Sequence, residues 1–142
     1  MRFWDSSAII PLLVTEARSP AARGHYEHDP DMAVWWATET ECVSGLARLE
    51  RDGHLGAGEI TLAIGRLDRL GAAWQEIQPI ARIRLIANRL LRTHSLRAAD
   101  ALQIAAAIVA AEEQPASLGL VTFDQRLAEV AAREGFSVSG PG

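Results

Sequence analysis

The sequence contains no lysine, and all fourteen of its basic residues are arginine. This absence excludes a lysine nucleophile, a Schiff base and a Walker-type phosphate-binding lysine. The eighteen acidic residues outnumber the arginines and give the chain a formal net charge of −4. A broad positive field that would hold nucleic acid non-specifically is therefore excluded, and any polyanion has to be bound locally.

Cysteine and long apolar runs are also scarce. The single cysteine, Cys42, has no partner for a disulfide or a thiolate zinc site, which favours a reducing compartment. The apolar segments 8–14 and 104–111 are too short to span a bilayer, and the first contains Pro11 and lacks a small-residue cleavage pattern. The sequence therefore predicts a cytoplasmic protein without a signal peptide or a contact with the membrane.

The remaining composition is typical of one globular domain. Apolar residues make up 49% of the chain and charged residues 23%. A chain of 142 residues is long enough to bury roughly two thirds of its unfolded surface, so no disulfide or metal is needed for folding. Because no linker, repeat or low-complexity tract divides the sequence, residues 1–142 are predicted to form a single domain.

Apolar periodicity and turn signals predict strands that alternate with helices. The expected strands are 2–4, 32–36, 74–78, 118–122 and 136–138, and the expected helices are 8–19, 38–51, 58–70, 79–94, 98–111 and 124–134. This order predicts an α/β fold, a three-layer α/β/α sandwich with a mostly parallel central sheet. In such a fold the junctions between strands and helices line one edge of the sheet, where ligands bind.

Four acidic residues occupy these junctions. Asp5 follows the first strand, Glu41 lies in the first turns of the helix after the second strand, and Asp124 follows the fourth strand. Asp100 starts a helix whose only other polar residue is Gln103, and burying an unpaired ionised carboxylate there would cost several kcal/mol. Any one aspartate alone could be an ordinary helix N-cap or a partner of the helix dipole.

Together, the four carboxylates predict a bound cation. Two carboxylates about 4 Å apart repel by roughly 4 kcal/mol at an effective dielectric constant of about 20, so four should not gather without a counter-ion. Because the candidate ligands are all oxygens, Mg²⁺ is favoured over zinc, with Mn²⁺ as a possible substitute. Such an ion polarises phosphate oxygens and activates water, so the pattern indicates phosphate chemistry.

The sequence resembles the PIN-domain ribonucleases, and within them the VapC-like toxins of type II toxin–antitoxin modules. The resemblance spans nearly the whole chain and rests on Asp5-Ser6-Ser7, Thr40-Glu41-Cys42, Ala99-Asp100-Ala101-Leu102, Thr122-Phe123-Asp124 and Arg126-Leu127. It implies a catalytic, metal-binding quartet of Asp5, Glu41, Asp100 and Asp124, with Ser7 and Thr122 as supporting hydroxyl groups. It also implies an endoribonuclease that forms a homodimer and is neutralised by a small antitoxin protein.

One member of the quartet has a competitor in the sequence. Glu39 stands two residues before Glu41 and could supply the same carboxylate. A step of two residues turns a helical side chain by about 200°, so only one of the two can face the site. The residue pattern by itself leaves this choice open.

Candidates for contact with RNA are arginines and tryptophans. Arg97 stands three residues before Asp100 and could reach a phosphate near the site. Three further arginines on the helix after Pro79 could follow an RNA backbone or simply form a solvated face: Arg82, Arg89 and Arg92. For Trp35 and Trp36, packing within a strand is the ordinary role and base stacking is the alternative.

Two other functions fit parts of this pattern. The first is a metal-dependent phosphatase in which the aspartate after the first strand is the nucleophile. Haloacid-dehalogenase-like sites of this kind usually have a second aspartate two residues later, where this chain has Ser7, and a later lysine. The second is a PIN-fold interaction module without nuclease activity, which becomes attractive only if the acidic set is incomplete.

Overall fold

Five short strands form one parallel sheet in the computed structural model, which describes residues 1–140. The strands are β1 (Arg2–Trp4), β2 (Met32–Trp35), β3 (Gln75–Ile77), β4 (Gly119–Val121) and β5 (Ser137–Ser139). Their order across the sheet is β3-β2-β1-β4-β5, and every neighbouring pair runs parallel. The predicted parallel sheet is confirmed.

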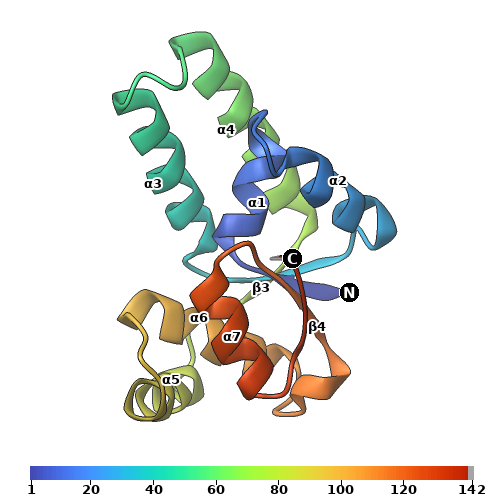
Figure 1. Ribbon diagram of the computed structural model, residues 1–142, viewed down its shortest axis with the longest axis vertical. Helices are drawn as coiled ribbons and strands as arrows, with labels where there is room; N and C mark the ends of the chain where they lie inside the picture. The colour runs from blue at the N-terminus through green and yellow to red at the C-terminus, as the bar shows by residue number, and fades with distance from the viewer. Residues whose placement is uncertain (141–142) are drawn as a thin grey trace.

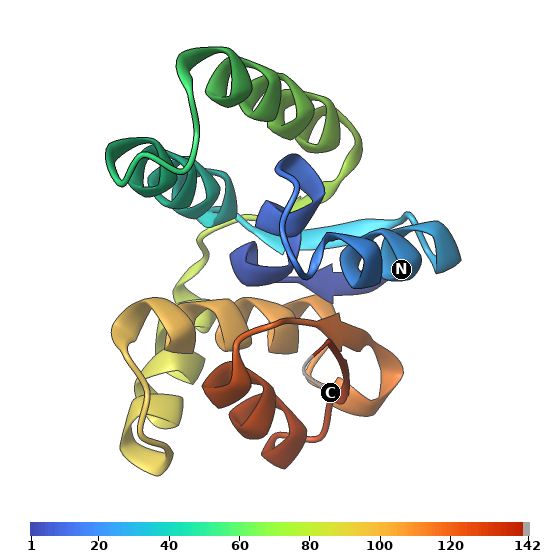
Figure 2. The ribbon, with the colours of Figure 1, turned by 45° about the horizontal axis from the view of Figure 1, so that its top comes forward.

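Helices cover both faces of this sheet. They are α1 (Ser6–Leu13), α2 (Ser19–His28), α3 (Thr38–Arg51), α4 (Ala57–Ala73), α5 (Ala81–Thr93), α6 (Ala98–Ala110), α7 (Gln125–Arg133) and the 3₁₀ turn η1 (Pro115–Ser117). Figure 2 shows α1 to α4 on one side of the sheet and α5 to α7 on the other. The three-layer α/β/α sandwich is confirmed. Within residues 1–140, no helix has the length and apolar character needed to cross a membrane.

Successive residues of the strands enter two different cores. Phe3 and Leu120 pack in the core under α5, α6 and α7. Trp4 and Val121, the next residues on the same strands, pack in the core under α1 to α4. This two-residue alternation with both faces buried is typical of parallel strands covered by helices on both sides.

The region after the first strand differs from the prediction, because it forms two helices instead of one. α1 ends at Leu13, and α2 begins at Ser19. The Ser19 hydroxyl donates to the Val14 carbonyl and accepts from the backbone N–H of Glu16, which fixes the turn between the helices. Pro20 was expected to end a helix, but it lies in the first turn of α2, where a proline removes no needed hydrogen bond. The other elements agree with their predicted ranges to within a few residues at each end.

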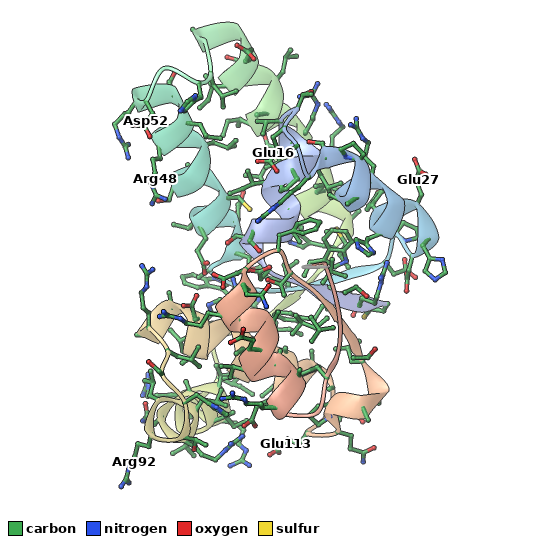
Figure 3. All side chains as sticks on the ribbon, in the orientation of Figure 1. Glu16, Glu27, Arg48, Asp52, Arg92 and Glu113 are labelled. Carbon is green, nitrogen blue, oxygen red and sulfur yellow. The ribbon has the colours of Figure 1, made fainter. Side chains whose placement is uncertain are left out.

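Helices α3 and α4 form a hairpin that extends away from the sheet (Figure 1). α3 ends before Gly53, whose φ of +79° is a conformation that glycine adopts without strain. The side chains of Arg48 and Asp52 point outward from the far part of α3 (Figure 3). The base of α3, which carries Glu41, remains beside the sheet.

The connections of the sheet change direction between β1 and β4. The chain runs from β1 to β2 to β3, and then α5 and α6 carry it back to β4 on the other side of β1. A change of direction of this kind leaves a crevice at the carboxyl ends of the two strands. Asp5 follows one of these strands, and Asp124 lies shortly after the other.

Candidate active site

Asp5 is the most deeply buried of the predicted acids, with only 4% of its surface exposed. It precedes α1, but its side chain makes no capping bond to that helix. Its Oδ1 instead accepts a hydrogen bond of 2.8 Å from the Ser7 hydroxyl. Burial raises the pKa of Asp5 to about 6, although hydrogen bonds from Ser7 and Thr122 lower it. Helix capping therefore does not account for this carboxylate.

Two hydroxyl groups join the loop after β1 to the loop after β4. The Oγ of Ser7 and the Oγ1 of Thr122 lie 3.1 Å apart. The Ser7 Oγ also accepts from the backbone N–H of Phe123, and the Thr122 Oγ1 accepts from that of Asp124. The predicted pair of hydroxyl residues thus lies between Asp5 and Asp124 and holds both loops.

Asp124 combines a structural and an electrostatic role. Its Oδ1 accepts from the backbone N–H of Leu127 at 3.0 Å, so it is the N-cap of α7. Its negative charge also raises the pKa values of Asp5 and Asp100. Asp124 is therefore the residue that links these two aspartates electrostatically.

Glu41 is held in place by residues of two other helices. Its Oε1 accepts from the Gln103 amide at 3.1 Å, and its Oε2 accepts from the Ser6 hydroxyl at 3.3 Å. The same Gln103 nitrogen donates to the Thr38 hydroxyl. Burial raises the pKa of Glu41, and the charge of Asp100 adds to this effect. Glu39 is exposed, so Glu41 is the member of this pair that faces the other acids.

Asp100 lies in the first turn of α6 and is half-buried. Burial raises its pKa, and so does the charge of Asp124. The guanidinium groups of Arg97 and Arg126 act in the opposite direction. Two cations therefore lie near this carboxylate, and Arg97 is the one that the sequence analysis selected.

Charge effects connect the four carboxylates. The charge of Asp124 raises the pKa values of Asp5 and Asp100, and the charge of Asp100 raises the pKa of Glu41. Within residues 1–140, none of them forms a salt bridge. In this part of the chain, no three or more acidic, histidine or cysteine side chains are grouped so that they could hold a metal ion together. An open set of oxygen donors fits Mg²⁺, which usually keeps several waters and takes only one or two carboxylates directly.

Three further residues act on the acids without having been predicted from the sequence: Ser6, Gln103 and Arg126. Gln103 was detectable, because it stands three residues after Asp100 on an otherwise apolar helix and so shares its face. Ser6 stands beside the selected Ser7, but only the tertiary structure shows which hydroxyl contacts which acid. Arg126 lies in the first turn of α7, whereas Asp100 lies on α6. No sequence spacing connects these two residues.

The arginines of α5 do not form the free phosphate path that was considered from the sequence. Arg82 is paired with Glu113, and Arg89 is paired with Glu134. Arg92 lies at the far end of α5 and points away from the body of the protein (Figure 3). These contacts favour the alternative interpretation, a solvated helix face.

Comparison with known proteins identifies the family. A family model described as PIN domain matches residues 2–133. The chain belongs to the PIN domain family. This PIN domain is similar to two proteins from strains of Mycobacterium tuberculosis, Ribonuclease VapC45 and Ribonuclease VapC49. Each is 27% identical over 125 residues, which cover 88% of this chain and 85% of the relative.

Solved structures share the fold of this PIN domain. A toxin-antitoxin complex from Klebsiella pneumoniae matches with a TM-score of 0.67 and 18% identity, over 100% of this chain and 98% of that chain. FitAcB from Neisseria gonorrhoeae matches with a TM-score of 0.68 and 18% identity, over 99% and 98% of the two chains. PAE2754 from Pyrobaculum aerophilum gives 0.60 and 20%, over 91% and 83%. At these identities the similarity establishes the fold.

Proposed function

We propose that this PIN domain is a divalent-metal-dependent endoribonuclease and the toxin of a type II toxin–antitoxin module. The main support is the series of four carboxylates at one edge of the sheet, none of which has a salt-bridge partner among residues 1–140. Relatives named Ribonuclease VapC and a structural neighbour described as a toxin-antitoxin complex agree with it. The proposed catalytic residues are Asp5, Glu41, Asp100 and Asp124.

The same residues would hold the metal ion. Asp5 and Asp100 would bind Mg²⁺, or Mn²⁺ in its place, and Glu41 and Asp124 would complete the site directly or through water. The bound ion supplies positive charge and Lewis acidity at the scissile phosphate. Ser7 and Thr122 keep Asp5 and Asp124 in position through the hydrogen bonds described above.

Side chains of the protein account for proton transfer and for binding of the neighbouring phosphates. A carboxylate with a raised pKa is a stronger base than an exposed one, so Glu41, held by Gln103 and Ser6, is suited to take a proton from the attacking water. Attack of this water on phosphorus breaks the bond to the 3′ oxygen, which takes up a proton from solvent, and Glu41 then returns its own proton to solvent. The products then carry a 5′-phosphate and a 3′-hydroxyl. Arg97 and Arg126, which both lower the pKa of Asp100, would bind neighbouring phosphates.

The partners follow from the same proposal. An RNA is the substrate, a small antitoxin protein is the inhibitor, and two copies of the chain, each a single domain over residues 1–142, form a homodimer in the cytoplasm. A phosphatase is less well supported, because Ser7 occupies the place of the second aspartate and donates to Asp5. An interaction module without activity is also less well supported, because all four acids are present at the edge of the sheet.

The decisive experiment is cleavage of total cellular RNA by the purified protein in Mg²⁺ or Mn²⁺, with new RNA ends mapped by sequencing. We expect cuts at defined positions that disappear with a chelator, with Asp100→Asn and with Glu41→Gln. Glu39→Gln is the matched control, because its carboxylate is exposed, and it should cleave like the wild type. Cleavage that survives Asp100→Asn, or that needs no metal, would refute the proposed function.

A further inference from the structure

The two adjacent tryptophans have opposite environments. Trp35 is 6% exposed and packs in the core under α5 and α6, whereas Trp36 is 53% exposed. Tryptophan is usually largely buried, because its ring is the largest apolar side chain. Packing therefore explains Trp35 and leaves the exposure of Trp36 unexplained.

The position of Trp36 connects it to the acidic edge of the sheet. Trp36 directly follows β2, and Asp5 and Ser6 directly follow β1, the parallel neighbour of β2, so these residues lie at the carboxyl edge of the sheet. Ser6 is the residue whose hydroxyl donates to Glu41. Adjacent strands lie about 4.8 Å apart, so the carboxyl ends of β1 and β2 are neighbours at this edge.

The backbone of Trp36 is also firmly supported. Its N–H donates to the carbonyl of Ile77 at 3.0 Å, which extends the pairing of β2 with β3 by one residue. Two residues later α3 begins, and Thr38 at its start accepts from the buried Gln103. The indole ring is thus presented to solvent from a fixed support, between the end of β2 and the helix that carries Glu41.

We propose that Trp36 is a stacking platform for an unpaired RNA base next to the scissile phosphate. This inference rests on the proposed nuclease function. Every base has an aromatic face that can stack on tryptophan, and such stacking strengthens binding by roughly 5- to 150-fold per base. Bases in an A-form duplex are already stacked on each other, so only an unpaired base can reach the ring.

The chemistry around the ring favours RNA over a protein segment. A base is neutral, so stacking on Trp36 brings no further negative charge to the acidic edge of the sheet. A nucleotide brings a neutral base for the ring and a phosphate for the region of Arg97 and Arg126.

The test measures binding of a short, labelled single-stranded RNA to a cleavage-deficient Asp100→Asn protein by fluorescence anisotropy. In this background, Trp36→Ala should weaken binding by about tenfold, and Trp36→Phe should stay within about threefold of the parent. Leu85→Ala is the matched control, because Leu85 is an exposed apolar residue at 61% on α5, and it should leave the affinity unchanged. The same strand annealed to its complement should bind weakly, with no dependence on Trp36.

A kinetic arm in the cleavage-competent protein separates this inference from the proposed function. Trp36→Ala should raise KM for the single strand and leave kcat within about threefold, and thermal melting should show that the variant is folded. If the wild type cleaves RNA but Trp36→Ala has unchanged affinity and KM, the stacking role is refuted and a protein contact becomes the explanation of the exposed ring. If no RNA is cleaved, the proposed function fails, and the binding arm still decides the role of Trp36.

Discussion

Burial disfavours the ionised form of Asp5 more strongly than that of the other acids of the site. The side chain is almost completely buried, and its pKa is raised to about 6. The hydroxyl of Ser7 and the loop that carries Asp124 limit where this carboxylate can move. A position of this kind is expensive for stability and is useful when a cation neutralises it.

Asp5→Asn should therefore make the metal-free protein more stable above pH 6. The carboxyl group ionises near pH 3.8 in the unfolded chain and near pH 6 in the folded chain, so its unfavourable contribution is absent below about pH 4 and complete above about pH 6. A shift of this size corresponds to about 2–3 kcal/mol at pH 8. Urea unfolding of both proteins in a chelator, at pH 4 and pH 8, measures the difference. Equal pH dependence in the two proteins would contradict the prediction.

Gln103 is expected to position Glu41. Gln103→Met removes the amide that bonds Glu41 and Thr38 but keeps a similar side-chain volume. It also removes a buried oxygen that has no partner, so the net loss of stability should be at most about 1 kcal/mol. We expect kcat for RNA cleavage to fall about tenfold or more, because Glu41, the proposed general base, is no longer fixed. Gln114→Met, at an exposed position, is the control.

At the level of secondary-structure elements, α5 and the end of α7 are joined by one acidic residue. Glu134 accepts two hydrogen bonds from the Arg89 guanidinium and one from the His94 ring. The Glu134 and His94 side chains are largely buried, at 13% and 8% exposed. These contacts connect the C-terminal parts of α5 and α7, which lie on the same side of the sheet (Figure 2).

Glu134→Gln should destabilise the protein at neutral pH by about 1–2 kcal/mol. The hydrogen bonds from Arg89, and then from His94, lower the pKa of Glu134 below that of the unfolded chain. The stabilisation is therefore present above about pH 4.5 and is lost as the pH falls through the folded pKa, so variant and wild type should converge in acid. Guanidinium chloride unfolding at several pH values tests this.

Glu113→Gln provides the control for this prediction. Glu113 forms a similar pair with Arg82, but both side chains are about half exposed. Surface ion pairs of this kind contribute little to folding, so the substitution should not change the unfolding midpoint measurably. An equal loss from both substitutions would show that burial at Glu134 has no special effect.

Across the whole molecule, the net charge of −4 means that the proposed RNA substrate would have to be bound through a few local cations. Arg97→Gln should weaken RNA binding at low salt and reduce the slope of log affinity against log salt by about 1. Arg82→Gln should change neither quantity, because Arg82 lies in a pair with Glu113. Anisotropy titrations of both variants over a range of salt concentrations measure the slopes. Identical slopes for Arg97→Gln and the wild type would place the phosphate contacts elsewhere.

The class of fold and most of its elements could be predicted from the residue pattern alone. Apolar periodicity and turn signals located all five strands and the long helices, and α3 has the predicted bounds. It could not separate α1 from α2, because a proline in the first turn of a helix resembles one that ends a helix. The four acids were also identifiable, because each stands where a strand meets a helix or in the first turns of one.

Only the tertiary structure decided which groups contact one another at the site. Residues 5, 41, 100 and 124 come from four separate parts of the chain. Their charges affect one another's pKa values only because the chain returns from β3 to place β4 beside β1. The choice between Glu39 and Glu41 depends on how α3 is rotated against α6, which local sequence does not encode. The same is true of Trp35 and Trp36, since burial is a property of the neighbours that a side chain acquires on folding.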